Sequence, residues 1–331
     1  MAVLNTEDRA FWDENGYVII PDAVPPENIK AAKASVWDFL EMRSDERESW
    51  YPNPPRRGIM AEMYQHQALW DNRQYPRVHQ AFAEILGCEQ LWVSIDRVSL
   101  SPPERTPSKD SEKLPSDSIS KPPIPMHWDY ALQLHGDGKP TLTQGCFDTP
   151  IPFWVQGVLY LTDTAADGGA FACVPEFHRN IEGWLETLPA DIDPRVQDKD
   201  GRLFQGYDAW LETLPSNADS LKQDLIGYGA KPVPAKAGDL IIWHNSLPHG
   251  AGYNTSEHPR VVQYMTMFPA QEKDETALKL RLKAWRNSME DWLVEAPSVK
   301  EELRKEKERD RGETAKLSPL GRKLLGVDSW E

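Results

Sequence analysis

Cysteine is scarce in this chain, and long apolar runs are missing from it. The 331 residues include three cysteines, Cys88, Cys146 and Cys173. Their number is odd and their spacings match neither a zinc site nor a redox pair, so we expect reduced thiols in a cytoplasmic protein. No segment approaches the roughly 18 consecutive apolar residues of a membrane-spanning helix. The acidic, polar beginning of the chain also differs from a signal peptide, and we expect no membrane partner.

A surplus of basic residues is missing as well. The chain has 37 Lys and Arg residues against 52 Asp and Glu residues, which gives a formal net charge of −15. Because a nucleic-acid-binding protein usually presents a basic face, we do not expect nucleic acid as a partner. Tryptophan, in contrast, is abundant, with 13 residues. Side chains of this size either fill a large core or line a pocket.

The first 90 residues are predicted to be mainly helical. Thr6 is expected to cap a short helix that Gly16 ends. Apolar residues then recur at helical spacing after Pro25, and again at 76–86. This part of the chain is therefore expected to supply helices that flank a core formed by later residues.

Beyond residue 90 the pattern changes to short runs separated by loops. These runs alternate in polarity or are rich in β-branched and aromatic residues, as strands are. The expected strands are 91–100, 153–162, 170–174, 239–243 and 261–268. Because loops rather than regular helices connect them, they favour an antiparallel sandwich or barrel.

Two histidines and one aspartate are candidate ligands of a single iron ion. His127 and Asp129 lie two positions apart, and in an extended segment such residues point to the same side. His249 follows the expected strand at 239–243 and precedes a run of small residues, where backbone and substrate can approach closely. Such a ligand set on one face of the ion leaves other positions open for a co-substrate and O2. His244 is the alternative third ligand.

Arg260 lies eleven residues beyond His249, after an Asn-Thr-Ser turn. We expect a hairpin whose second strand brings Arg260 alongside the metal. A guanidinium group can bind a carboxylate through two parallel hydrogen bonds, and so could hold one end of a dicarboxylate. Gln156, in an aromatic-rich strand, is a candidate to bind the co-substrate or substrate, with a polar residue on the open face of that strand as the alternative. Arg97 is a candidate to bind a substrate carboxylate, with a salt bridge to a nearby acid as the alternative.

Four segments of the chain carry a recognisable pattern. They are MHWDY (126–130), DGGAFACVPEFHR (167–179), AGDLIIWH (237–244) and LPHGAGYNTSEHPR (247–260). Together they resemble the phytanoyl-CoA dioxygenase family of Fe(II)/2-oxoglutarate-dependent oxygenases. The resemblance implies a mainly β fold with flanking helices, around a double-stranded β-helix core of the cupin-like jelly-roll type. It also implies that His127, Asp129 and His249 bind Fe(II), and that Arg260 binds the distal carboxylate of 2-oxoglutarate.

The same resemblance implies a reaction. Such an enzyme couples oxidation of a small organic substrate to the conversion of 2-oxoglutarate and O2 into succinate and CO2. Asp129 fills the position that a bound halide would need, which favours hydroxylation or another oxidation over halogenation. The alternatives are a cupin-type metal-dependent isomerase or lyase, which has no need for Arg260, and a non-catalytic binding protein on the same fold.

One domain is expected to span residues 1–331. Its expected parts are a mainly helical start (1–90), a jelly-roll core (91–270) with a long loop (101–123) and an insertion (180–236), and a charged helical extension (271–331). The loop at 101–123 is rich in Pro, Ser and charge and joins a core strand to the metal-binding segment. We interpret it as a lid that closes over bound substrate, and an insertion without a role is the alternative.

Overall fold

The computed structural model of the protein describes the chain in several stretches. They are residues 2–51, 58–105, 154–179, 230–288 and 314–330, together with the backbone of strands at 132–134 and 140–142. His127 and Asp129 lie outside the described residues. The same is true of most of the predicted lid (106–123), most of the predicted insertion (180–229) and part of the C-terminal extension (289–313).

The larger sheet has six strands in the order β1-β10-β7-β12-β4-β2, and all neighbouring strands are antiparallel. Its strands are β1 (Tyr17–Ile20), β2 (Ile59–Ala61), β4 (Val98–Ser101), β7 (Val155–Tyr160), β10 (Leu240–His244) and β12 (Arg260–Met265). Strands far apart in the sequence are neighbours, since β1 near the start of the chain pairs with β10. The predicted antiparallel architecture is confirmed.

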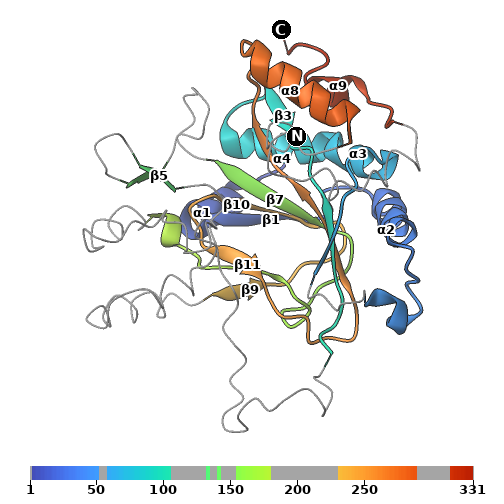
Figure 1. Cartoon of the computed structure of the whole chain (residues 1–331). Coiled ribbons are helices and arrows are strands. Elements are labelled where there is room, and N and C mark those ends of the chain that lie inside the picture. The colour runs from blue at the N-terminus through green and yellow to red at the C-terminus, as the bar shows by residue number, and fades with distance from the viewer. Residues whose placement is uncertain are drawn as a thin grey trace.

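A smaller sheet of three strands lies opposite the larger one (Figure 1). In the order β11-β8-β9, its strands are β11 (His249–Ala251), β8 (Phe171–Cys173) and β9 (Lys231–Val233). Two further antiparallel pairs are β3 (Leu91–Val93) with β13 (Met267–Pro269), and β5 (Leu132–Leu134) with β6 (Pro140–Leu142). Two facing antiparallel sheets form the double-stranded β-helix, or jelly roll, that the sequence predicted.

Most of the helices gather on the outer side of the larger sheet, away from the smaller one (Figure 1). The helices are α1 (Thr6–Asn15), α2 (Pro26–Leu40), α3 (Gln67–Arg73), α4 (Pro76–Leu86), α8 (Glu275–Arg286) and α9 (Pro319–Leu325), with a short 3-10 helix at Arg47–Trp50. The helix predicted at 76–86 has the predicted bounds, and Gly87 ends it in a left-handed conformation. The flanking helices therefore cover one face of the core, as expected.

The start of α1 differs from the prediction by one residue. Asn5, not Thr6, caps this helix, because its side-chain oxygen accepts the backbone N–H groups of Glu7 at 2.7 Å and Asp8 at 2.9 Å. The Asp8 carboxylate in turn accepts the backbone N–H of Asn5 at 2.9 Å. This reciprocal pair satisfies helix-end donors that would otherwise be unpaired. Asn and Thr both form caps, so composition alone does not choose between neighbouring positions.

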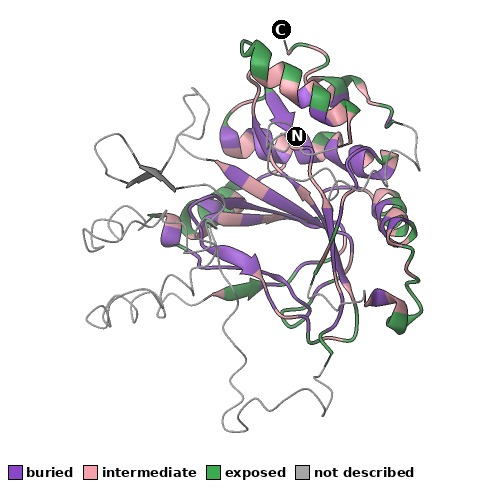
Figure 2. Cartoon of the chain, in the orientation of Figure 1, coloured by how far each residue is buried: buried purple, intermediate pink, exposed green. Residues whose placement is uncertain are grey.

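Strands β7 and β10 have two different faces. One face belongs to the apolar core beneath the helices, and it includes Leu159, Leu240 and Ile242. The other face points toward the smaller sheet, because the Trp243 ring lies 4.6 Å from the Phe171 ring, centroid to centroid. Gln156 pairs directly with Trp243 and so shares its face, and alternation adds Tyr160. The strands of both sheets are largely buried, except for the exposed β9 (Figure 2).

Two of the predicted strands are interrupted, which the prediction missed. Segment 91–100 forms β3 and β4, and segment 261–268 forms parts of β12 and β13. In both segments one strand, β4 or β12, belongs to the larger sheet, whereas the other, β3 or β13, belongs to a two-stranded sheet. Both breaks occur where the Ser94 N–H donates to the Thr266 carbonyl at 2.7 Å, while the Thr266 N–H donates to the Ser94 hydroxyl at 2.9 Å. A side chain that replaces a ladder bond lets both strands bend together. Apolar alternation does not reveal such a bend.

Gly157 on β7 leaves room for α4. A Cβ atom at this position would lie 2.7 Å from Cζ of Phe82 and 2.8 Å from the Met265 carbonyl oxygen. We expect Gly157→Ala to lower the free energy of unfolding by about 1–3 kcal/mol, because packed groups must move to admit the methyl group. Chemical denaturation measures this loss. Gly58→Ala is the matched control, since its nearest neighbour would lie 3.5 Å away, and equal losses would contradict the packing argument.

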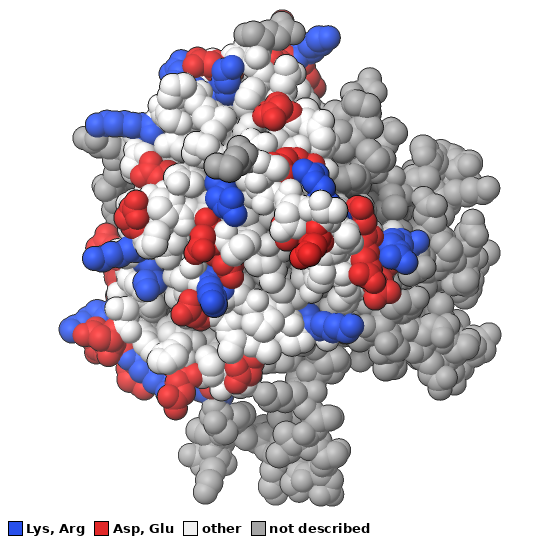
Figure 3. Space-filling view, turned by 180° about the vertical axis from the view of Figure 1, so that it is seen from behind, with Lys and Arg blue, Asp and Glu red and all other residues white. Residues whose placement is uncertain are grey.

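The surface shows charges of both signs. On the face in Figure 3, basic and acidic side chains are interspersed rather than separated. None of the helices within the described stretches combines the length and the apolar character needed to cross a lipid bilayer.

The two described cysteines, Cys88 and Cys173, are free thiols.

Candidate functional site

His249 lies between the two sheets. It begins β11 and is 3% exposed. Its ring centroid is 6.1 Å from that of Phe171 on β8 and 5.1 Å from that of Trp243 on β10. The imidazole is therefore held by aromatic rings from both sheets, in an environment with little water.

The hydrogen bond of His249 fixes which ring nitrogen carries the proton. Nδ1 lies 2.9 Å from the carbonyl oxygen of Leu247. Because a carbonyl oxygen can only accept, Nδ1 must be the donor, and Nε2 of the neutral ring keeps its lone pair. Metal-binding histidines commonly hold this tautomer through a hydrogen bond from the other nitrogen. His249 is thus prepared to bind a metal through Nε2.

His244 has the opposite arrangement. Its Nδ1 accepts the backbone N–H of Ser246 at 3.1 Å, so Nδ1 carries the lone pair and Nε2 carries the proton. The ring lies on the helix side of β10, 6.4 Å from the Trp12 ring and 5.4 Å from the His178 ring. The two histidines therefore differ in tautomer: the hydrogen bond of His244 leaves the proton on Nε2, whereas that of His249 leaves a lone pair on Nε2.

Burial, together with the smaller effect of the nearby His178, lowers the pKa of His244 from 6.5 to about 3. The unfolded chain binds a proton at this residue below about pH 6.5, whereas the folded protein does not until about pH 3. Stability therefore falls as pH is lowered through this window. We expect His244→Asn, which keeps an acceptor for Ser246, to flatten the decline in unfolding free energy between about pH 7 and about pH 5.

Denaturation at a series of pH values measures that slope, and only the slopes are compared because the substitution also removes packing on Trp12. The exposed His258 supplies the control, since His258→Asn removes a histidine without affecting a buried ring. A wild-type slope in His244→Asn would show that the buried ring does not limit stability in acid.

Arg260 supplies a buried cation to the same interior. It begins β12 and is 3% exposed. Within the described stretches no carboxylate forms an ion pair with it, and its Nε has no hydrogen-bond partner there. Burial lowers the pKa of Arg260, but Tyr160 and Tyr264 raise it above its usual value, so the guanidinium stays charged. A buried cation of this kind requires an anion.

Tyr160 connects Arg260 to His249. The Arg260 guanidinium carbon lies 5.4 Å from the centre of the Tyr160 ring. The Tyr160 hydroxyl accepts the backbone N–H of Phe171 at 2.7 Å, and the Phe171 ring packs on His249. A hydroxyl that accepts can still donate its own proton. Tyr160 and Arg260 are thus neighbours that can both donate to one anion.

The predicted hairpin between His249 and Arg260 is wrong. β11 pairs with β8 in the smaller sheet, whereas β12 pairs with β4 and β7 in the larger sheet. In a double-stranded β-helix, consecutive strands belong to opposite sheets, so the two residues lie in different sheets instead of side by side in one hairpin.

Comparison of the sequence with known protein families identifies the family of the chain. The family model of phytanoyl-CoA dioxygenase (PhyH) matches residues 12–262, which include all four segments of the resemblance. The chain belongs to the phytanoyl-CoA dioxygenase family. A Dictyostelium discoideum protein named for phytanoyl-CoA dioxygenase is 20% identical over 294 residues, which are 78% of this chain and 74% of that protein.

Solved structures are similar at lower identity. GIG2 from Candida albicans has a TM-score of 0.64 and 13% identity, with 99% of this chain and 77% of that chain covered. At this identity the similarity shows the fold. The epimerase SnoN, solved in complex with Fe3+, alpha ketoglutarate and nogalamycin RO, has a TM-score of 0.48 and 17% identity, with 80% of this chain and 83% of that chain covered.

The other two predicted site residues of this phytanoyl-CoA dioxygenase family member differ in position. Gln156 on β7 faces the interior beside Trp243 and is half-buried. Arg97 lies between β3 and β4, with its Nε 3.7 Å from the Asp96 carboxylate, as the salt-bridge alternative proposed. Tyr160 was not predicted at all. Its position four residues after Gln156 in the same expected strand was the signal, because alternation puts both on one face.

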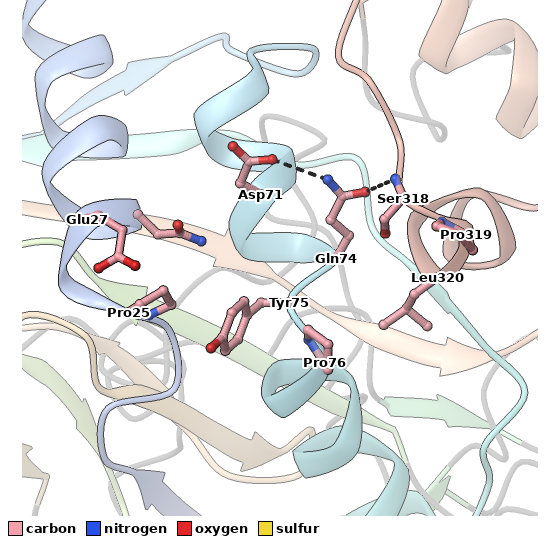
Figure 4. Close-up of a pocket in the computed structure, with 10 residues that line it drawn as sticks. Pro25, Glu27, Asp71, Gln74, Tyr75, Pro76, Ser318, Pro319 and Leu320 are labelled. Carbon is pink, nitrogen blue, oxygen red and sulfur yellow. Dashed lines mark hydrogen bonds between the residues drawn. The ribbon is translucent and has the colours of Figure 1, made fainter.

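A separate hollow of about 600 Å3 lies between α2, α3 and α9 (Figure 4). Gln74 links its walls by donating to Asp71 at 3.2 Å and accepting the backbone N–H of Ser318 at 2.7 Å. Its lining contains no histidine or arginine that could bind a metal or an anion. We interpret this hollow as a gap left where the C-terminal segment packs against the helices.

Proposed function

We propose that this protein is an Fe(II)- and 2-oxoglutarate-dependent oxygenase that oxidises a small organic molecule. The observation that supports it best is Arg260, a buried cation that forms no ion pair with the described residues. It shares the interior of the jelly roll with His249, whose Nε2 lone pair suits a metal. Family membership is consistent with this combination.

Iron would be held by His249 together with His127 and Asp129. The tautomer of His249 supports its part, and the spacing of His127 and Asp129 supports theirs. This ligand set is the 2-His-1-carboxylate type that suits Fe(II) and leaves positions open. Iron and 2-oxoglutarate, when bound, supply the oxidative chemistry, which belongs to the cofactor rather than to the protein.

Arg260 would hold the distal carboxylate of 2-oxoglutarate. The planar guanidinium binds a carboxylate through two hydrogen bonds, and the Tyr160 hydroxyl can add a further donor. Because the cation is buried, its attraction for an anion is little weakened by solvent. Gln156 faces the same interior and could contact the co-substrate or substrate.

The protein itself orients the reactants and excludes water. Phe171 and Trp243 surround His249 with apolar surface, which limits water around the reacting groups. Hydroxylation or a related oxidation is the proposed outcome, since the carboxylate of Asp129 leaves no place for a halide.

The test is a co-substrate assay. Purified protein is incubated with Fe(II), ascorbate, 2-oxoglutarate and a panel of small metabolites, and succinate and oxidised product are quantified. We expect one substrate class to give product and succinate together, only when 2-oxoglutarate is present. Substrate conversion that needs the metal but consumes no 2-oxoglutarate would contradict the proposal and favour an isomerase or lyase.

A further inference from the structure

The buried indole ring of Trp243 packs on His249, with the ring centroids 5.1 Å apart. Trp243 is 4% exposed, and its Nε1 has no hydrogen-bond partner in the described part of the chain. Leaving such a donor without an acceptor is destabilising, and native proteins seldom do so. An acceptor is therefore expected at this position, and the described residues do not provide it.

Lack of a partner alone does not mark a site. Trp92 and Trp285 also have indole nitrogens without partners in the described stretches. Their rings pack against Phe268 and Trp70, at centroid distances of 6.5 Å and 6.4 Å. Of these three indoles, only Trp243 packs on a candidate metal ligand.

The order of strands in the larger sheet separates Trp243 from Arg260. β7 lies between β10, which carries Trp243, and β12, which carries Arg260. The two side chains thus lie on opposite flanks of β7. Arg260 and Tyr160 would hold one end of a dicarboxylate, whereas the Trp243 ring is 5.1 Å from the His249 ring at the metal end.

We propose that Trp243 is a positioning residue whose Nε1–H donates a hydrogen bond to the 2-oxo acid end of 2-oxoglutarate, opposite the end that Arg260 holds. This inference rests on the proposed function. An indole N–H only donates, so its partner must be an oxygen such as that of a carboxylate. The co-substrate is then fixed at both ends, by a cation at one and by a buried neutral donor at the other.

The first test observes the N–H directly. Wild-type protein loaded with Zn(II), which supports no turnover, is labelled with nitrogen-15 in its tryptophan side chains and titrated with 2-oxoglutarate. We expect the Trp243 indole proton to move downfield and to exchange more slowly with water. Spectra of Trp243→Phe and Trp243→Tyr assign its resonance independently.

The second test measures affinity by calorimetry on the same Zn(II)-loaded proteins. Trp243→Phe keeps an aromatic ring but loses the donor, so Kd for 2-oxoglutarate should rise about tenfold. Trp285→Phe is the matched control and should bind as the wild type does. An unmoved Trp243 resonance, or a wild-type Kd in Trp243→Phe, would overturn this inference while leaving the proposed function intact. If the loaded wild type binds no 2-oxoglutarate, the proposed function fails as well.

Discussion

His249→Ala is expected to abolish both iron binding and turnover. The substitution removes the Nε2 lone pair, which is available because Nδ1 donates to the Leu247 carbonyl. An open iron site of this type has only three protein ligands, so the loss of one should prevent binding. Metal content after loading with Fe(II) under anaerobic conditions measures the first effect, and succinate formation measures the second. Comparable losses are expected in His127→Ala and Asp129→Ala.

His244→Asn is the matched control for His249→Ala. It alters a buried histidine in the same segment, but one whose Nδ1 serves Ser246. Iron content close to that of the wild type is expected, with a lower thermal stability at most. If His249→Ala retained full iron and activity, or if His244→Asn lost them instead, the assignment of the third ligand would be wrong.

Arg260→Lys should bind 2-oxoglutarate far more weakly than the wild type. Lysine keeps the charge but loses the planar fork that makes two parallel hydrogen bonds. The expected loss is roughly 1–3 kcal/mol for a hydrogen bond to a charged group, and each 1.4 kcal/mol or so raises Kd about tenfold. Calorimetric titration of the metal-loaded variant measures it.

Arg322→Lys is the control for this substitution. Arg322 lies on α9 at the surface and pairs with Asp328, so the same chemical change is made far from the interior. Its Kd should match that of the wild type. Unchanged affinity in Arg260→Ala would show that another group binds the distal carboxylate.

Much of the fold was predictable because its local signals agree with one another. Ile29, Ala32, Val36 and Phe39 recur at helical spacing, and all four are buried in α2. Gly16 and Gly87 end their helices with positive φ, at 74° and 63°, a conformation that favours glycine. The sequence pattern predicts the structure correctly at these residues because their burial and their backbone conformation are local properties.

The spatial relation of strands was less predictable, since it depends on contacts far apart in the sequence. The spacing between His249 and Arg260 fits a hairpin as well as it fits two strands in different sheets. Only pairing of β11 with β8 distinguishes the two arrangements. Likewise, Tyr160 became a candidate site residue only through its contacts with the Phe171 backbone and with Arg260. The sequence alone does not predict these contacts.

The C-terminal segment shows the same limit. The predicted charged helical extension at 271–331 includes long-range contacts that its composition does not indicate, since Trp330 stacks on His79 with centroids 5.3 Å apart and donates to the Leu91 carbonyl at 3.0 Å. The buried Arg281 donates to the carbonyls of Leu324 and Leu325 at the end of α9, at 3.0 Å and 2.9 Å. A cation at a helix C-terminus is favourable, but its partners lie more than forty residues away in the chain.

The most direct measurement is the visible absorption of the Fe(II)-loaded protein when 2-oxoglutarate is added without O2. A 2-oxo acid that chelates Fe(II) produces a charge-transfer band, which reports metal and co-substrate in one site. We predict a band that saturates with one 2-oxoglutarate per protein, is absent in His249→Ala and needs more 2-oxoglutarate in Arg260→Lys. No band in the wild type, or a band that both variants retain unchanged, would contradict the assignment of this interior as the iron and 2-oxoglutarate site.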